Sequence, residues 1–300
     1  MTFNEQLLTL KQNSTKEFDE GILGKLTFER INLVVANLEK VNITNLIPDL
    51  NKQNKLFQVE CIDIGVYFVA YQNTNKSLII FKVNTLNKRI ARLDEKSISE
   101  HKSFKSLKIK RHKRFMILIA ADVNKSIGYQ ISLDENLSLV RQADLSSNII
   151  AVTMNDSLIY CLTSRSNSPL DLYNLQFQYL KSIGNSASSI LFPSNIKYID
   201  NRNGRFFTLS NTGFFNIIDE QKGSILATVK VNADKFMFDS NQNVLIVDET
   251  NRKIKYFDLS GNLINSVDLL GAVNDFTYFI GPDDSLAIFD ESQFCFLINK

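Results

Sequence analysis

The chain has 300 residues, of which 44% are hydrophobic, and its 34 basic and 32 acidic side chains leave a formal net charge of only +2. This composition indicates a folded protein with a sizeable core, and the near-neutral charge gives no global argument for a polyanion or a membrane surface as partner. No apolar run is long enough to span a bilayer, and Met1–Gln6 lacks the basic start of a secretory signal. We therefore expect a cytoplasmic protein with no membrane contact.

The first 50 residues differ from the rest of the chain. Apolar residues up to Leu23 follow a loose helical spacing, and the stretch from Leu26 to Val41 also fits one face of a helix. Within that stretch Ile31–Val35 would serve equally as a strand, although a helix is favoured. Pro48 then ends the region. We predict a short helical N-terminal segment over residues 1–50, within which a ring-closing strand is an alternative, and a second domain over residues 51–300.

From about residue 57 onward a strand pattern recurs roughly every 40 residues. In the clearest copy Asn243–Thr250, Lys253–Asp258 and Leu263–Val267 read as three antiparallel strands joined by tight turns. The last bulky apolar residue of the middle strand of each copy gives the equivalent positions: Phe81, Ile131, Tyr173, Ile218, Phe257 and Leu297. This spacing is typical of the four-stranded blades of a β-propeller.

The composition of the individual copies supports the same architecture. The second strand of most copies is nearly continuous in apolar residues, as in Phe115–Ala120 and Leu158–Leu162, which indicates burial on both faces. Asn, Asp, Ser and Gly fill the connections, as tight β-turns require. We therefore predict an all-β fold, a β-propeller with six blades. A seven-bladed ring, with a degenerate blade in residues 26–56, is the alternative.

The last copy is one strand short. It begins at Phe276–Phe279, continues through Leu286–Phe289 and ends with Phe294–Ile298. Propellers commonly close by pairing strands from the two ends of the chain, which leaves no open edge. We therefore predict that a segment before residue 57 pairs with the last sheet, and the candidates are Ile43–Leu50 and Ile31–Val35.

The pattern Val-Leu-Ile-Val-Asp, Lys-Ile-Lys-Tyr-Phe-Asp and Gly-Asn-Leu of residues 244–263 resembles an NHL-type repeat of a six-bladed propeller. A helical segment before such a ring is similar to the C-terminal part of tripartite-motif proteins. That resemblance implies surfaces that bind proteins or RNA. With three cysteines and two histidines the chain has no RING or B-box zinc module, so ubiquitin ligase activity is not implied. The lack of tryptophan argues against a typical WD40 ring.

The densest charge lies in residues 101–114, where lysine and arginine alternate with Phe104, Leu107 and Ile109. If the basic side chains share one face, they would contact several phosphates, with Phe104 as a stacking platform. The candidate nucleic-acid-binding residues are Lys105, Lys108, Lys110, Arg111, Lys113 and Arg114. The favoured interpretation is an outer strand and its turn, with the apolar side chains inward and solvated lysines outside.

Catalytic and metal-binding patterns are weak. Asp122, Asp200, Asp248 and Asp290 lie near predicted strand ends, where carboxylates hold calcium in some propellers but more often accept hydrogen bonds from turn amides. His101 and His112 have no evident carboxylate partner for acid–base work. No nucleophile-elbow, zincin or phosphate-loop motif is present. The three cysteines, Cys61, Cys161 and Cys295, lie in apolar strands and read as reduced thiols, so we expect no enzyme, cofactor or metal.

Taken together, these patterns predict a non-enzymatic β-propeller scaffold that recognises a protein partner through loops on one face. The first alternative is an RNA-binding propeller that uses residues 101–114. The second is a calcium-dependent propeller hydrolase or lactonase. Self-association through the N-terminal helix is a further possibility, although its apolar positions are too irregular for a stable coiled coil.

Overall fold

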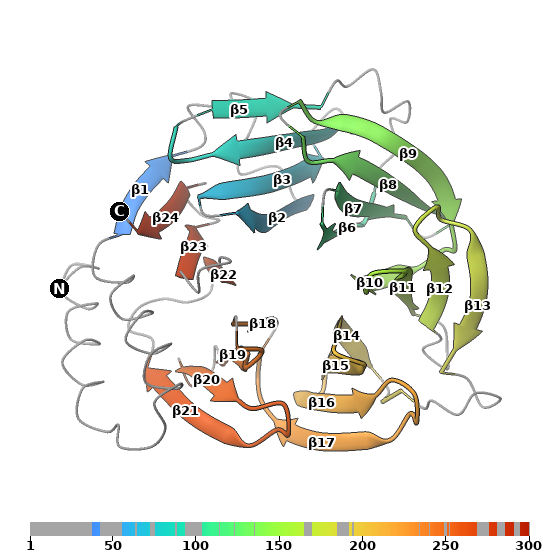
Figure 1. Ribbon diagram of the computed structural model, residues 1–300, viewed down its shortest axis with the longest axis vertical. Helices are drawn as coiled ribbons and strands as arrows, with labels where there is room; N and C mark the ends of the chain where they lie inside the picture. Colours follow the sequence, from blue (N-terminus) through green and yellow to red (C-terminus); the bar gives the residue numbers. More distant parts are fainter. Residues whose placement is uncertain are drawn as a thin grey trace. The chain divides into compact units, whose positions relative to one another are not determined.

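The computed structural model shows β-strands joined by turns and short loops (Figure 1). The residues that it describes are 38–42, 56–63, 65–72, 76–87, 89–93, 104–113, 115–122, 124–134, 136–164, 170–184, 192–193, 195–233, 235–239, 241–248, 251, 253–268, 276–280, 286–290 and 295–299. The chain divides into two compact units. The larger unit comprises Lys52–Ile62 and Val66–Lys230, and the smaller comprises Met1–Asn51, Asp63–Gly65 and Val231–Lys300.

The larger unit contains four sheets, each a four-stranded antiparallel meander in which sequence neighbours pair. The strands of the first two sheets are β2 (Leu56–Asp63), β3 (Val66–Gln72), β4 (Leu78–Asn84), β5 (Arg89–Arg92), β6 (Ser106–His112), β7 (Phe115–Ala121), β8 (Ser126–Ser132) and β9 (Ser138–Leu145). Those of the next two are β10 (Ile149–Met154), β11 (Leu158–Thr163), β12 (Leu170–Asn174), β13 (Tyr179–Ile183), β14 (Ile196–Arg202), β15 (Arg205–Ser210), β16 (Phe214–Asp219) and β17 (Ile225–Lys230). Within this unit the first strand of each sheet lies on the inner side and the fourth on the outer side (Figure 1).

The smaller unit contains two four-stranded sheets. One is a meander of β18 (Phe236–Phe238), β19 (Val244–Asp248), β20 (Lys253–Phe257) and β21 (Leu263–Asp268). The other has the order β1-β24-β23-β22 and combines β1 (Leu38–Asn42) with β22 (Phe276–Ile280), β23 (Leu286–Asp290) and β24 (Cys295–Asn299). β1 pairs antiparallel with β24, with Leu38 opposite Asn299 and Asn42 opposite Cys295.

Apolar layers between successive sheets hold the larger unit together. Phe68 and Ala70 of β3 pack with Leu107 of β6 and Leu118 of β7. Ile117 and Ile119 on the other face of β7 pack with Val152 and Met154 of β10. Tyr160 and Leu162 of β11 pack in turn with Ile199 and Phe206 of the next sheet. The second strand of each sheet therefore has apolar side chains on both faces, which explains its continuous apolar sequence.

The outer strands carry a recurring irregularity. In β9, β13, β17 and β21 the pairing register shifts by one residue, so each strand has one extra residue with no partner opposite. That residue is an aliphatic side chain in every case, and each is between 44% and 56% exposed: Val140, Leu180, Leu226 and Ile264. The outer strands thus differ from the second strands both in burial and in the regularity of their ladders.

Short turns join the strands of each sheet, and the β14–β15 hairpin illustrates their chemistry. Arg202 pairs with Arg205, which leaves only Asn203 and Gly204 in the loop. Both have positive φ angles, 49° and 70°, as a type I′ turn requires. A Cβ atom on Gly204 would meet nothing within 4 Å, so the backbone conformation alone favours glycine here.

The repeat expected from the sequence is confirmed as a series of four-stranded sheets, and their number equals the number of repeats. How many sheets form one ring stays a prediction. In the described residues, the strand from the region before residue 57 belongs to the sheet of β22–β24 rather than to a separate blade, unlike the seven-bladed alternative. Pairing of an early segment with the last sheet is confirmed.

The position and the type of that early segment were wrong. The pairing strand is β1, which lies between the two candidates Ile31–Val35 and Ile43–Leu50. The helix favoured up to Val41 is replaced by strand from Leu38, because β1 supplies the fourth strand that this sheet lacks. The other residues of the predicted helical segment lie outside the described residues.

Candidate functional site

The first strands of three successive sheets, β6, β10 and β14, lie side by side, since β10 contacts both β6 and β14. A four-stranded meander ends at the level where its first strand began, and only three residues separate β9 from β10. β10 therefore runs in the same direction as β6, and the same reasoning applies to β14. Side chains near the ends of these strands consequently meet at one level.

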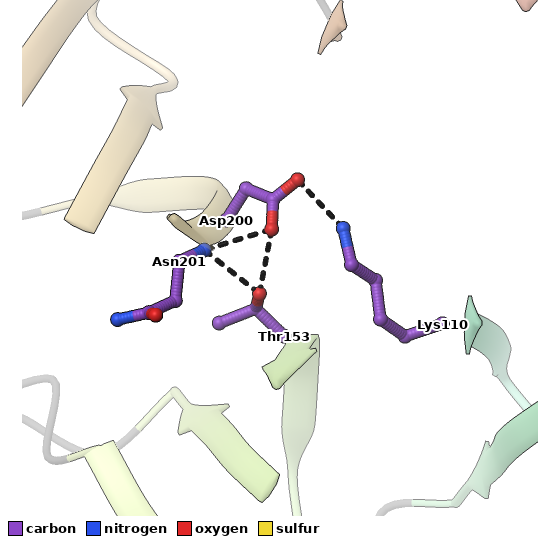
Figure 2. Close-up of polar contacts among 4 residues, drawn as sticks. All are labelled: Lys110, Thr153, Asp200 and Asn201. Atoms are coloured by element: carbon purple, nitrogen blue, oxygen red, sulfur yellow. Dashed lines mark hydrogen bonds and ion pairs between the residues drawn. The ribbon is translucent and has the colours of Figure 1, made fainter. Parts of the chain in front are cut away.

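A buried aspartate joins the three strands (Figure 2). The Lys110 ammonium of β6 lies 2.6 Å from Oδ2 of Asp200 in β14, and Thr153 Oγ1 of β10 donates a 2.8 Å hydrogen bond to Oδ1 of the same carboxylate. The backbone N–H of Asn201 donates to Thr153 Oγ1 at 2.9 Å and to Asp200 Oδ1 at 2.7 Å. Both carboxylate oxygens are thus satisfied by groups from neighbouring strands.

The Asp200 carboxylate is ionised in this environment. Burial by itself raises the pKa of Asp200, but the charges of Lys110 and Arg202 and the hydrogen bonds from Lys110 and Thr153 outweigh it, so the pKa lies below its ordinary value. A carboxylate stabilised in this way is a poor general base. Its geometry suits it to hold three sheets together.

A second chain of hydrogen bonds crosses the ends of the same sheets. Asn155 Nδ2, in the β10–β11 turn, donates to the Tyr160 hydroxyl at 2.8 Å, and this hydroxyl donates to Glu220 Oε1 at 2.6 Å. Asn201 Nδ2 donates to Glu220 Oε2 at 3.0 Å. Burial, followed by the hydrogen bond to Glu220 and its charge, raises the pKa of Tyr160, so its hydroxyl stays protonated.

These contacts fix several turns at one end of the larger unit. We call this surface the turn platform; it consists of the turns at Lys113, Asn155–Ser157, Asn203–Gly204 and Glu220–Ser224. The Lys113 ammonium lies 3.1 Å from Asp156 Oδ1, and the Glu220 N–H donates to the Gly204 carbonyl at 3.0 Å. Most side chains of these turns are exposed.

Exposed apolar side chains follow two turns at this end. Ile225 and Leu226 come directly after the β16–β17 turn, and Tyr179 and Leu180 directly after the β12–β13 turn. Because both turns connect the third and fourth strands of their sheets, they lie at the same end as the turns of the platform. Each pair is about half exposed. The rim of the turn platform therefore combines solvated polar turns with apolar anchors.

In the described part of the basic run, residues 104–113, the basic side chains do not share one face. This run contains β6, which is the first strand of its sheet and not the expected outer strand, because β7 and β10 cover it. Phe104, Leu107 and Ile109 point into the core as expected. Of the predicted nucleic-acid ligands, Lys105 and Arg111 are exposed, and Lys108 and Lys110 lie half-buried on the face toward β10. Lys113 pairs with Asp156, and Arg114 lies outside the described residues.

The other predicted residues hold structural contacts. Asp248 accepts hydrogen bonds from the Asn251 side chain at 2.9 Å and from Lys255 at 2.7 Å, and the Asp122 N–H donates to the Lys125 carbonyl. Cys161 is buried, and burial with the nearby charge of Asp171 raises the pKa of its thiol, which disfavours a nucleophilic role. Cys61 lies in β2 and is partly buried.

The remaining candidate positions add no catalytic group. His112 stacks on Phe115 at 4.5 Å between ring centroids, with its Nε2 atom 3.9 Å from Asp156 Oδ1. The side chains of Asp290 and Cys295, and His101 as a whole, lie outside what the structure describes. Among the described residues no group of three or more His, Cys, Asp or Glu side chains is placed to hold a metal ion.

Sequence reasoning missed the residues that connect the sheets. Thr153, Tyr160 and Glu220 were not candidates, and Lys110 and Asp200 were assigned to different kinds of site. The partners of Asp200 are 47 and 90 residues away, so no local spacing indicates them. The available signal was a polar residue near the C-terminal end of each first strand, at 110, 153 and 200.

Comparison with known proteins gives structural likeness alone. No protein-family model matches the chain, and no match exists among curated proteins. A chain in the crystal structure of the mitotic checkpoint complex is similar with a TM-score of 0.58 and 11% identity over 87% of this chain and 94% of that one. The WD40 β-propeller domain of Doa1 gives a TM-score of 0.48 and 10% identity over 82% of this chain and 93% of that domain.

The repeated four-stranded meanders and the likeness to known structures define a β-propeller. The NHL-type and tripartite-motif resemblance is not supported, since no family model matches the chain. No helix in the described part of the chain has the length and apolarity needed to cross a bilayer.

Proposed function

We propose that this β-propeller is a non-enzymatic scaffold that binds a protein partner through the turn platform of the larger unit. The observation that carries this proposal is the pairing of fixed turns with the exposed apolar pairs Tyr179–Leu180 and Ile225–Leu226. Exposed apolar side chains beside polar turns are typical of protein-binding surfaces. Turns that are already held in place lose little entropy when a partner binds.

The buried polar groups favour a scaffold over an enzyme. The carboxylates of Asp200, Glu220 and Asp248 are each engaged with protein donors, so none of them is available to a substrate. The dispersal of the basic residues of β6 between two faces weakens the RNA alternative, because phosphate contacts need charges on a shared surface. Recognition by loops on a rigid framework requires neither feature.

The proposal is tested by affinity capture with the full chain and with a Leu180→Glu/Leu226→Glu variant. These residues have no opposite partner in their ladders, so the substitution adds charge to the surface without removing a core contact. Partners that bind the turn platform should be enriched by the unaltered chain, survive RNase treatment and be lost from the variant.

Ile264→Glu is the matched control, since Ile264 occupies the same irregular position in β21 of the smaller unit and is similarly exposed. It should retain the partner. Equal capture by all three chains would rule out the turn platform, and partners that disappear only after RNase treatment would favour the RNA alternative.

A further inference from the structure

Lys108 differs from Lys110, although both project from the same face of β6. The two residues are two positions apart on a strand, and Leu107 and Ile109 on the other face belong to the core. Lys110 has Asp200 as its counter-ion. In the described part of the chain the Lys108 ammonium makes no hydrogen bond or ion pair, although its side chain is half-buried. A desolvated cation with no counter-ion costs folding free energy.

At the same level the neighbouring strands offer Lys108 no counter-ion, whereas the Asp200 level is bridged. Because β6, β10 and β14 run in the same direction and Lys110, Thr153 and Asp200 meet, the residues two positions earlier also share a level. They are Lys108, Ala151 and Tyr198. Ala151 has only a methyl group where Thr153 supplies a bridging hydroxyl. Nothing from β10 therefore connects Lys108 to β14 at this level.

The charges around this level favour an occupant with a single negative charge. Burial, then the charges of Asp200 and Glu60, raise the pKa of Tyr198 and the charge of Arg202 lowers it; the pKa is raised on balance, and two carboxylates and one guanidinium lie close enough to affect this phenol. A carboxylate ligand would gain the Lys108 charge while tolerating Asp200 and Glu60. A phosphate dianion or a polyanion would be repelled more strongly by the same carboxylates.

We propose that Lys108 anchors a carboxylate-binding subsite on the inner side of β6, β10 and β14. The ligand is one carboxylate group, either of a small acid or of an acidic side chain from another protein. This inference does not depend on binding at the turn platform, because Lys108 and the apolar pairs lie on different strands. The unpaired lysine is retained at a cost in stability because the ligand supplies its counter-ion.

The test is thermal unfolding of the full chain at neutral pH in sodium acetate and in sodium chloride of equal ionic strength. Acetate should raise the Tm of the unaltered chain by a few degrees above the chloride value. Lys108→Met, which keeps the length of the side chain and removes its charge, should lose this difference. In chloride its Tm should equal or exceed that of the unaltered chain, whereas a lysine with a merely structural role would give a lower Tm.

Lys181→Met is the control, since Lys181 is exposed on β13 and its loss should leave the acetate effect unchanged. Lys108→Gln gives the same comparison if the methionine variant does not fold. Two results would overturn the proposal: an acetate effect that persists in both Lys108 variants, or no acetate effect in the unaltered chain.

Two further probes identify the source of the carboxylate. Calorimetric titration with a capped Gly-Glu-Gly peptide is compared with titration by acetate. Tighter binding of the peptide assigns the carboxylate to a partner protein, and tighter binding of acetate assigns it to a small acid; both outcomes require loss in Lys108→Met. Stronger stabilisation by inorganic phosphate than by acetate would contradict the single-charge ligand.

Discussion

The buried aspartates of β14 and β19 have similar local surroundings, but the partners of one come from other sheets and those of the other from its own hairpin. Asp200 and Asp248 both lie near the end of an apolar strand, and the pKa of each is lower than usual because charges and hydrogen bonds outweigh burial. The partners of Asp200 come from β6 and β10, whereas those of Asp248 are Asn251 and Lys255 of the same hairpin. The first aspartate connects sheets and the second shapes a turn.

The comparison implies that their removal has unequal consequences. Asp200→Ala would leave Lys110 half-buried without its counter-ion, and we expect the free energy of unfolding to fall by about 3 kcal/mol or more. Chemical denaturation measures this loss. If Lys110→Met is combined with Asp200→Ala, part of the stability should return, because no unpaired charge remains. A loss below that of Asp248→Ala would contradict the role of Asp200 as a link between sheets.

Asp248→Ala should have a smaller effect. Its partners belong to the same hairpin, so its loss leaves the contacts between sheets intact. We expect destabilisation of about 1–3 kcal/mol. Hydrogen exchange should show it mainly in β19 and β20, whereas Asp200→Ala should increase exchange in β6, β10 and β14 together. Uniform exchange in both variants would remove the distinction.

We expect the hydrogen-bond chain of Asn155, Tyr160 and Glu220 to contribute less to the stability of the fold than either aspartate. Tyr160→Phe removes the hydroxyl that joins Asn155 to Glu220 but keeps the ring, which packs edge to face on Phe206 at 5.2 Å. We expect a loss of about 1 kcal/mol in equilibrium unfolding. Tyr179→Phe, an exposed position, is the matched control and should change stability by far less.

The last prediction concerns the stability of the fold at acidic pH. Because the pKa of Asp200 is lower in the folded than in the unfolded chain, its contribution is fully present above the ordinary value of 3.8 and is lost as the pH falls through the folded value. Below about pH 4 the free energy of unfolding of Asp200→Asn should therefore fall less steeply as the pH decreases. The difference in slope corresponds to at most one proton per molecule. An unchanged slope in acid denaturation would mean that Asp200 is not ionised in the fold.

The sequence predicted local features better than contacts between sheets. The continuous apolar strand Leu158–Leu162 and the turns rich in Asn, Asp, Ser and Gly follow from residue types within a few positions, so periodicity and turn chemistry indicated them. Asp248 was correctly placed at a strand end for the same reason. The Lys110–Asp200 pair spans 90 residues, and no local pattern shows which strands meet. β1 was misplaced because Leu26–Val41 fits one face of a helix, and only the pairing of Leu38–Asn42 with β24 decides for strand at this position.

The extra residue in β9, β13, β17 and β21 has a consequence for how molecules of this protein meet one another. A regular outer strand offers a row of unused amide and carbonyl groups, with which the edge of another sheet can form backbone hydrogen bonds. Here the extra residue interrupts this row near the start of each strand, and its side chain is a β-branched or γ-branched aliphatic group. Outer strands with this irregularity resist the edge-to-edge pairing of molecules that produces fibres at high concentration. Their exposed aliphatic side chains can still contact a smaller ligand.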